Sequence, residues 1–184
     1  MLARAFDDDP VATYLMPSAR RRPSGLRTFF RVQMAKDLLA YGGVFTTADR
    51  AGAALWAPPG KPSLPLSRAL LNALPTVPYV AGRNFFRSIQ FLAHVEAIHP
   101  KEPHWYLATL GTDPVRQGHG IGSALLAPVL AQCDLDGARA YLESSKERNI
   151  PFYRRHGFEV TGEVNLAGGP PVWTMWREPR PPED

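Results

Sequence analysis

The chain reads Arg116-Gln117-Gly118-His119-Gly120-Ile121-Gly122-Ser123 between an apolar run, residues 106–110, and a helical pattern, residues 124–130. We call residues 116–123 the glycine turn. Its glycines leave backbone N–H groups uncovered by side chains and permit a close ligand approach that a Cβ would block. These N–H groups lie where the dipole of the following helix is positive, which favours a pyrophosphate. The stretch therefore predicts a site for a phosphate-bearing cofactor.

The glycine turn has three further interpretations. A P-loop needs a lysine before its final Ser or Thr, but this run ends Ile121-Gly122-Ser123, which argues against nucleotide hydrolysis. A dinucleotide site is nearer, because Gly118, Gly120 and Ser123 almost fit its fingerprint and Glu143 lies about 20 residues on. That fold needs a long series of strand–helix units, for which the rest of the chain is short. A turn that only packs a helix on a strand is the third.

Two motifs carry a resemblance to a known family. Gln117, Gly120 and Gly122 occupy the positions of the Gln/Arg-x-x-Gly-x-Gly/Ala motif of the GNAT acetyltransferase superfamily, and Asn149-Ile150-Pro151-Phe152-Tyr153-Arg154-Arg155-His156-Gly157-Phe158 is similar to its second signature. The resemblance implies one α/β (α+β) domain over residues 1–184, with an acyl-CoA-binding core over residues 105–164. Its sheet is mixed and mostly antiparallel, with splayed central strands and flanking helices. Acetyl-CoA is the implied cosubstrate.

Within that family, residues 99–109, 141–145 and 169–175 resemble the puromycin N-acetyltransferase branch. This implies a small-molecule amine as acceptor, an aminonucleoside or other antibiotic among the candidates, and a role in self-protection or detoxification. Similarity is dense from Lys101 to Trp173 and sparse before it. We therefore expect acetyl-CoA use to be shared and puromycin itself to be a poor substrate.

Composition restricts the function classes. The 184 residues are 45% hydrophobic and 21% charged, which is ordinary for a globular domain, and the net charge of +4 suits an anionic cofactor. Arg20-Arg21-Arg22 lacks interleaved aromatic residues, so we interpret it as a solvated helix flank and expect no nucleic-acid partner. Cys133, the single cysteine, predicts a buried apolar side chain in a reducing compartment. The absence of an apolar run long enough for a membrane span predicts a cytoplasmic protein without a membrane partner.

The first half of the chain predicts helices around one hairpin. Ser24 is a candidate N-cap for a helix over residues 24–39, and residues 44–47 and 52–57 form a hairpin turned at Asp49-Arg50. Residues 61–98 form a helical insertion with helices at 66–74 and 84–98, which either covers a sheet edge or, as we favour, walls the substrate side.

The second half predicts the core of the sheet. A strand from Trp105 to Leu110 is followed by Gly111, where a glycine permits a bulge, and the resemblance implies that such a bulge splays this strand from the next. The remaining expected elements are a strand at 139–143, a helix at 148–156 and a closing antiparallel pair at 158–164 and 171–177.

The first residues raise a question about the sheet. Met1-Leu2-Ala3-Arg4-Ala5-Phe6 resembles the middle of the first GNAT helix, so the family's first strand is expected to be missing. The strand at 44–47 would then be an unpaired edge, which favours homodimer formation or poor solubility. The alternative is a shortened family member whose own helices cover that edge.

Acetyl transfer to an amine needs an attack geometry, a partner for the oxyanion and a proton for the thiolate. No cysteine or serine elbow is present, so we expect direct attack by the amine, without a metal. Tyr153 is the candidate acid, unless it is a packed aromatic and Phe152 lies in the wet position. Asn149 either binds the pantetheine arm or caps the helix. By resemblance, the backbone of Leu110, Gly111 and Thr112 pairs with pantetheine.

The base is less defined. Glu143, at the end of its strand, either accepts a proton, anchors an ammonium or only holds the next loop. His104 is the alternative, although beside Pro103 we expect it to face solvent, and His119 is expected to flank phosphate. The rival functions are acetylation of a protein N-terminus or lysine, and a non-catalytic acyl-CoA-binding module. The predicted cofactor-binding residues are Leu110, Gly111, Thr112, Gln117, Gly118, His119, Gly120, Ile121, Gly122, Ser123, Asn149, Phe152 and Tyr153.

Overall fold

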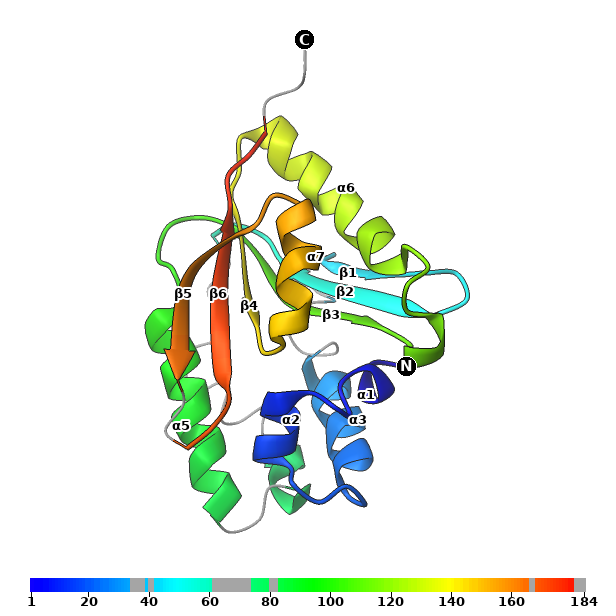
Figure 1. Ribbon diagram of the computed structural model, residues 1–184, viewed down its shortest axis with the longest axis vertical. Coiled ribbons are helices and arrows are strands. Elements are labelled where there is room, and N and C mark those ends of the chain that lie inside the picture. The colour runs from blue at the N-terminus through cyan, green and yellow to red at the C-terminus, as the bar shows by residue number, and fades with distance from the viewer. Residues whose placement is uncertain (34–38, 40–41, 61–73, 80–82, 166–167, 181–184) are drawn as a thin grey trace.

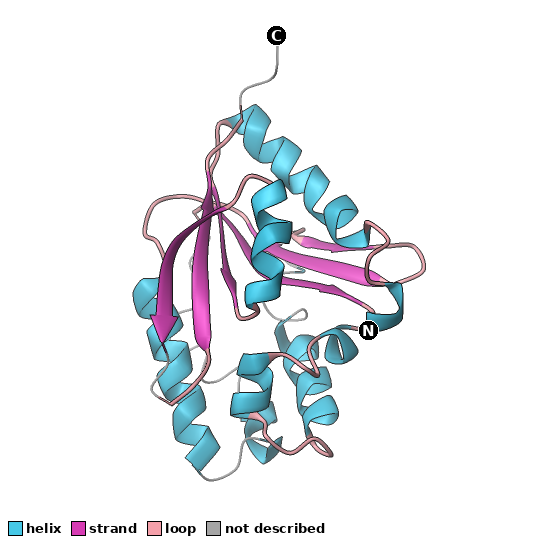
Figure 2. Ribbon diagram, in the orientation of Figure 1, coloured by secondary structure: helices cyan, strands magenta, loops and turns pink. Residues whose placement is uncertain are grey.

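The computed structural model describes residues 1–33, 39, 42–60, 74–79, 83–165 and 168–180. These residues form a six-stranded sheet in the order β1-β2-β3-β4-β6-β5, with helices on both faces (Figures 1 and 2). Its strands are β1 (Val44–Thr46), β2 (Gly52–Ala57), β3 (Trp105–Thr112), β4 (Ala140–Ser144), β5 (Glu159–Asn165) and β6 (Pro171–Arg177). Among them only β3 and β4 pair in parallel, so the predicted mixed, mostly antiparallel sheet is confirmed.

The predicted hairpins are present. β1 pairs with β2 from Val44↔Leu55 to Thr46↔Ala53, and the turn between them places Arg50 at a φ of 55°. The closing pair joins β5 to β6, with β6 also bonded to β4. Tight antiparallel connections thus build the two flanks of the sheet, and the parallel contact joins them in the middle.

The central strands separate soon after they meet. β3 and β4 pair only at Trp105↔Ala140, Tyr106↔Tyr141 and Leu107↔Leu142, after which they diverge (Figure 1). Beyond Leu107, β3 keeps β2 on one side but has no strand on the other among the described residues. The expected splay is therefore observed.

The bulge expected at Gly111 lies elsewhere. Leu55 pairs with Thr109 and Trp56 with Leu107, so Ala108 is the extra residue in β3. Gly111 instead pairs in register with Ala53. A Cβ built on Gly111 would meet the Leu2 side chain at 2.7 Å, because a helix packs closely there. The glycine serves this contact and does not interrupt the strand.

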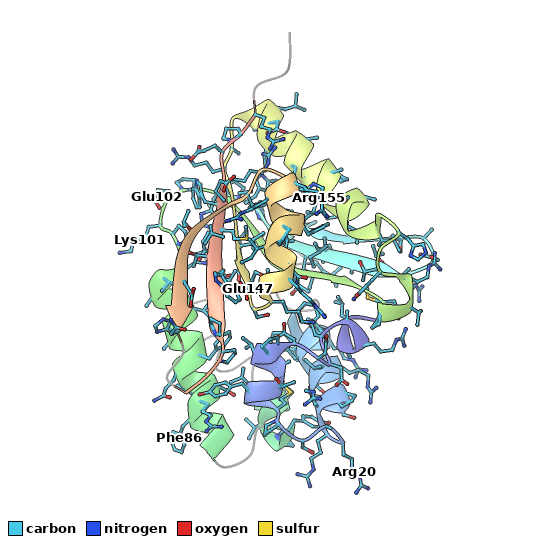
Figure 3. All side chains as sticks on the ribbon, viewed as in Figure 1. Arg20, Phe86, Lys101, Glu102, Glu147 and Arg155 are labelled. Atoms are coloured by element: carbon cyan, nitrogen blue, oxygen red, sulfur yellow. The ribbon has the colours of Figure 1, made fainter. Side chains whose placement is uncertain are left out.

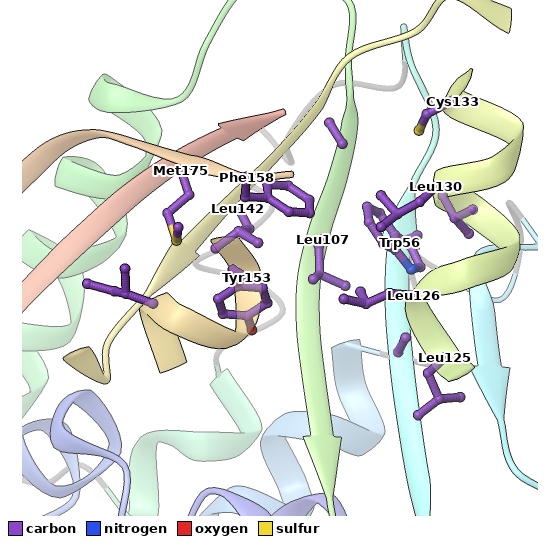
Figure 4. Close-up of a cluster of buried hydrophobic side chains, with 14 residues drawn as sticks. Trp56, Leu107, Leu125, Leu126, Leu130, Cys133, Leu142, Tyr153, Phe158 and Met175 are labelled. Carbon is purple, nitrogen blue, oxygen red and sulfur yellow. The ribbon is translucent and has the colours of Figure 1, made fainter. Parts of the chain in front are cut away.

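Successive side chains along a strand point to opposite faces of the sheet, and a separate hydrophobic core lies on each face. On one face α6 (Ile121–Asp136) and α7 (Ile150–Arg155) pack on the sheet around Trp56, Leu107 and Leu142 (Figure 4). Cys133 is fully buried in this core, as predicted, and burial raises the pKa of its thiol to about 11. Ala53 and Leu55 point to the opposite face and pack with α1 (Leu2–Ala5), α2 (Pro10–Leu15) and α3 (Arg22–Gln33).

The N-terminal helices differ from the predicted limits. The helix assigned to residues 24–39 begins at Arg22, so Ser24 lies inside it and is not its cap; a proline in the first turn, Pro23, is compatible with this earlier start. Residues 34–38 lie outside the described residues, as does the predicted helix at 66–74 apart from its last residue. α5 (Arg83–Ile98) confirms the second helix of the insertion, and a 3-10 helix at Leu74–Tyr79 precedes it.

The start of the chain is helical and not a strand. α1 covers Leu2–Ala5, and β1 is the edge of the described sheet. α1 does not pair with that edge; it packs against α3 and β3. Of the helices within the described ranges, none combines the length and apolarity that crossing a bilayer requires.

We predict that core packing under α6 dominates its contribution to stability. Leu126 is completely buried, whereas Leu135 on the same helix is 76% exposed. Leu126→Ala should lower the free energy of unfolding by about 2–5 kcal/mol, because it leaves a cavity. Leu135→Ala should change it by less than about 0.5 kcal/mol. Urea denaturation measures both, and equal effects would contradict the assigned helix face.

Candidate functional site

A cavity of about 540 Å³ lies where β3 and β4 part, and we call it the glycine-turn cavity. The glycine turn, β3 and α7 supply much of its wall. All of the predicted cofactor-binding residues line it except His119, and Glu143 lines it too. The structure thus brings together Leu110, Gly111, Thr112, Gln117, Gly118, Gly120, Ile121, Gly122, Ser123, Asn149, Phe152 and Tyr153.

The backbone of the glycine turn is suited to an anion. Gly118 and Gly120 have φ values of 80° and 75°, a region that L side chains rarely adopt, and nothing lies within 4 Å of a Cβ built at either. Gly120 is the N-cap of α6, so the first N–H groups of that helix face the cavity at its positive end. At Gly122 a Cβ would meet the Phe152 ring at 3.1 Å. Glycine is thus needed both for conformation and for packing.

Cations surround the same cavity. Arg116, Lys146, Arg148 and Arg155 line it, and Arg155 projects from α7 (Figure 3). Arg116 is 3.1 Å from Asp49, and Arg148 is 2.8 Å from Asp8, so part of this charge is already balanced. Exposed N–H groups together with guanidinium and ammonium groups fit the predicted pyrophosphate-bearing cofactor.

His119 is the one predicted cofactor-binding residue that the structure does not bring to the cavity lining, and its place beside a phosphate stays a prediction. It lies outside the cavity lining, is exposed, and its Nδ1 is 2.8 Å from the carbonyl of Gln117. The dinucleotide interpretation fails, because the described sheet has a single parallel pair instead of a parallel series. Glu143, its proposed ribose ligand, is held by Tyr106 on the opposite face of the sheet from α6.

Asn149 and Tyr153 both line the cavity from the α7 side. Asn149 occupies the N-cap position of α7 but makes no capping hydrogen bond with its side chain, so the alternative of a structural cap is not observed. Tyr153 is 8% exposed and lies edge-on to Phe152 and Phe158 (Figure 4). Burial, and secondly the charge of Asp9, raise the pKa of Tyr153. Its phenol therefore stays protonated at neutral pH.

A second cavity, of about 320 Å³, lies on the α1–α3 side, and we call it the apolar cavity. Helices α2, α3 and α5 line it, so α5 of the predicted insertion does form one of its walls. Its lining contains Asp9 and Glu143 as acidic residues, and no lysine or arginine among the described residues. The aromatic members are Phe6, Phe29, Phe30, Phe91 and Tyr106.

The two cavities meet at the gap between β3 and β4. Asp9, Thr109, Glu143 and Ser145 are among the residues that line both. Asp9 is buried; its Oδ1 accepts a hydrogen bond from the Ala12 N–H at 3.0 Å, and its Oδ2 accepts one from the Ser145 hydroxyl. Neither Asp9 nor Ser145 was predicted from the sequence, although Asp9 before Pro10 is a recognisable N-cap signal.

Glu143 lies in a polar cluster under the apolar cavity. The Tyr106 hydroxyl donates to Glu143 Oε2 at 2.7 Å, and His99 Nδ1 is 3.7 Å from Oε1. His104 is buried and does not face solvent as expected; its Nε2 is 3.2 Å from His99 Nε2. Burial lowers the pKa of His104. The described part of the chain contains no group of His, Cys, Asp and Glu that could hold a metal ion.

Comparisons with known proteins agree with this geometry. A profile of the acetyltransferase (GNAT) family matches residues 69–158. An uncharacterised N-acetyltransferase of Schizosaccharomyces pombe is 30% identical over 190 residues, which span 97% of this chain and 77% of the relative.

Solved structures share the fold. The crystal structure of a histone acetyltransferase HPA2 and related acetyltransferase from Corynebacterium glutamicum has a TM-score of 0.67 and 29% identity, over 100% of this chain and 90% of that one. A polyamine N-acetyltransferase of Drosophila melanogaster has a TM-score of 0.61 and 16% identity, over 96% and 90% of the two chains.

We predict that His104 makes the fold sensitive to acid. Its pKa is lowered in the folded state, so the unfolded chain takes up this proton first as the pH falls below about 6.5. The stabilisation is present above that pH and is lost below it, by at most about 1.4 kcal/mol for each pH unit. His104→Gln should show a shallower decline between pH 7.5 and 5 in urea denaturation. The exposed His94→Gln should follow the wild-type curve, and identical curves for all three proteins would contradict the prediction.

Proposed function

This chain belongs to the GNAT family of acetyltransferases, and we propose that it transfers the acetyl group of acetyl-CoA to the amine of a small molecule with an apolar body. The observation that carries the proposal is the meeting of the two cavities through the gap between β3 and β4. One cavity is built for an anionic, phosphate-bearing molecule. The other is apolar and ends at buried carboxylates. Such an arrangement lets two reactants meet inside the sheet from opposite faces.

The glycine-turn cavity would hold coenzyme A along its length. The N–H groups at the start of α6 would bind the pyrophosphate, with Arg116 and Arg155 nearby. The side of β3 from Leu110 to Thr112 that faces away from β2, where the described residues supply no neighbouring strand, and Asn149 would bind the pantetheine amides. When bound, acetyl-CoA supplies an acyl group already activated as a thioester. The chain therefore needs no covalent nucleophile of its own.

The apolar cavity supports an acceptor with an aromatic or aliphatic body and a single amine. Phe29, Phe30 and Phe91 offer rings for the body, while Asp9 and Glu143 lie where the amine would approach the gap. Burial of apolar surface would supply most of the affinity, at about 25 cal/mol per Å². A carboxylate at the inner end favours the ammonium form on arrival and can then accept its proton. This combination fits a small amine better than an extended peptide, which binds mainly through backbone hydrogen bonds.

The residues at the gap divide the proton chemistry between them. Glu143 faces the apolar cavity and accepts a proton from the amine, which becomes a nucleophile. Tyr153 lines the glycine-turn cavity from α7 and keeps its hydroxyl proton at neutral pH, since its pKa is raised. It would donate a hydrogen bond to the departing sulfur and then its proton. Base and acid thus lie on opposite sides of the gap.

A panel of amines tests the proposal. Wild-type protein with acetyl-CoA is incubated with arylalkylamines, polyamines, aminonucleosides including puromycin, and peptides carrying a free N-terminus or a lysine. Thiol release measures turnover. We expect the highest kcat/KM for compact amines with an apolar body, and poor use of puromycin. Preferential peptide turnover would make the chain a protein acetyltransferase, and coenzyme A binding without any turnover would make it a binding module; either result overturns the proposal.

The cofactor site is tested by a pair of glycines at the two ends of α6. Gly120 and Gly137 have φ values of 75° and 63°, each with open space around it, but only Gly120 lines the cavity. Coenzyme A at 100 times its Kd should stabilise the wild type by about 2.7 kcal/mol. This stabilisation raises Tm. Gly120→Asp, which places a negative charge where the phosphates would bind, should abolish the rise in Tm. Gly137→Asp carries similar backbone strain and should retain it; loss of the shift in both variants would point to general destabilisation.

The role of Tyr153 is tested by removing its hydroxyl alone. Tyr153→Phe should lower kcat by roughly 10²-fold or more, because the leaving sulfur loses its proton donor. The Tm shift caused by coenzyme A should stay the same, since ring packing against Phe152 and Phe158 is retained. Turnover near the wild-type rate would assign the proton donor to water.

A further inference from the structure

Behind Glu143, a cluster of rings leads away from the gap toward the surface. His99, directly after α5, lies edge-on to Tyr106 and Tyr141, with ring centroids 4.7 and 5.4 Å away. Its other neighbour is His104, at 5.0 Å between centroids. The outer end of the cluster is the loop at Glu102, a residue on the molecular surface (Figure 3). Neither histidine lines the apolar cavity, whereas Glu143, which His99 faces, does.

The hydrogen bonds in this cluster have one consistent direction. His104 Nδ1 is 2.6 Å from the backbone carbonyl of Glu102, which can only accept, so His104 carries its proton on Nδ1. Burial keeps His104 neutral by lowering its pKa, and its Nε2 is then an acceptor. His99 Nε2, 3.2 Å away, must be the donor. A neutral His99 therefore presents an unprotonated Nδ1 to Glu143 Oε1.

The two oxygens of Glu143 are not equivalent. Oε2 accepts from the Tyr106 hydroxyl, whereas Oε1 is buried without a hydrogen-bond partner among the described residues. Oε1 and His99 Nδ1, 3.7 Å apart, are thus both acceptors when the carboxylate is charged and the imidazole neutral. This distance is within ion-pair range but longer than a hydrogen bond, and such contacts often tighten when substrate binds. A single added proton makes the contact favourable.

Of Tyr106, Tyr141 and His99, which the structure brings close to Glu143, His99 is the proton acceptor. The groups that surround the carboxylate are Tyr106 on β3, Tyr141 on β4 and His99 at the end of α5. Burial, reinforced by the charge of Glu143, raises the pKa of both phenols, so they keep their protons. His99 itself faces Glu143 and Tyr141 on β4 and Tyr106 on β3. It also faces His104, in the loop between α5 and β3.

We infer that His99 is a positioning residue that takes over the substrate proton from Glu143, with its tautomer fixed by His104 and the Glu102 carbonyl. This inference rests on the proposed function. The ammonium N–H bond breaks as an O–H bond forms on Glu143. The carboxyl group then rotates to direct this O–H at His99, where the O–H bond breaks as an N–H bond forms at Nδ1. Glu143 is again a carboxylate, now beside an imidazolium. The proton that leaves the ammonium therefore does not stay on Glu143, and it does not return to the amine nitrogen that attacks.

The tautomers can be tested without any substrate. Long-range ¹H–¹⁵N NMR correlations distinguish the two ring nitrogens of each histidine, and His99→Asn and His104→Gln assign the signals. In the full-length protein at pH 8 we expect His104 as the Nδ1–H tautomer and His99 as the Nε2–H tautomer. When His99 takes up a proton, the new proton should lie on Nδ1, the nitrogen that faces Glu143. A neutral His99 with its proton on Nδ1 would overturn the inference.

Kinetics then separate proton transfer from support of the fold. His99→Asn can still hydrogen-bond Glu143 but cannot take a proton. We expect the ratio of wild-type to variant kcat/KM, in which the titration of the amine cancels, to be near one at pH 5.5 and to rise to roughly 10–100 at pH 8. The coenzyme A shift in Tm should not change, and the exposed His94→Asn should match the wild type throughout. A ratio that does not vary with pH would leave His99 a structural role and overturn the inference. If no amine is turned over at all, the proposed function fails while the NMR result stands by itself.

Discussion

The pairing of β3 with β4 ends after Leu107 and Leu142, and the rest of the site depends on this limit. β4 stays with β6 beyond that point, while β3 stays with β2 and takes up its extra residue at Ala108. A gap therefore separates β3 from β4 in the middle of the sheet, where neighbouring strands are normally hydrogen-bonded along their length. Backbone groups freed on β3 need partners. An extended ligand with amide groups can supply them.

The opening also explains where charged groups can be tolerated. A carboxylate buried in a protein is costly unless it is hydrogen-bonded or paired. Glu143 receives one hydrogen bond from Tyr106, while its other oxygen is buried without a hydrogen-bond partner among the described residues and has the His99 imidazole 3.7 Å away. Asp9, in contrast, is satisfied by the α2 backbone and by Ser145. Both acids line the gap, but Glu143 is the one whose second oxygen is left without a hydrogen bond within the described part of the chain.

The cofactor half could be predicted because its determinants are local. The glycine turn, α6, β4 and α7 lie within residues 116–155, and the two family motifs in this stretch pointed to Gln117, Gly120 and Asn149, which line one cavity. The acceptor half could not, because distant segments form it: Asp9 meets Ser145 across 136 positions of the chain. His99 and His104 gave no periodic signal, and only the fold shows that they contact each other behind Glu143.

The errors have physical reasons as well. Gly111 was expected to mark a bulge because glycine weakens a strand, yet the close contact with Leu2 explains this glycine equally well. His119, expected at the phosphates, lies outside the cavity lining with its ring beside the Gln117 carbonyl, and its role stays a prediction.

From the gap, one cavity extends to the glycine turn and α7 and the other to α2, α3 and α5. Under the proposed function neither reactant would have to pass through the space that the other occupies, so bound coenzyme A would leave the way open to the amine, and the amine to coenzyme A. The order of arrival is therefore not dictated by steric exclusion, and a random-order ternary mechanism is open to this architecture. Initial-rate patterns would reflect the relative affinities of the two ligands and not a fixed sequence of entry.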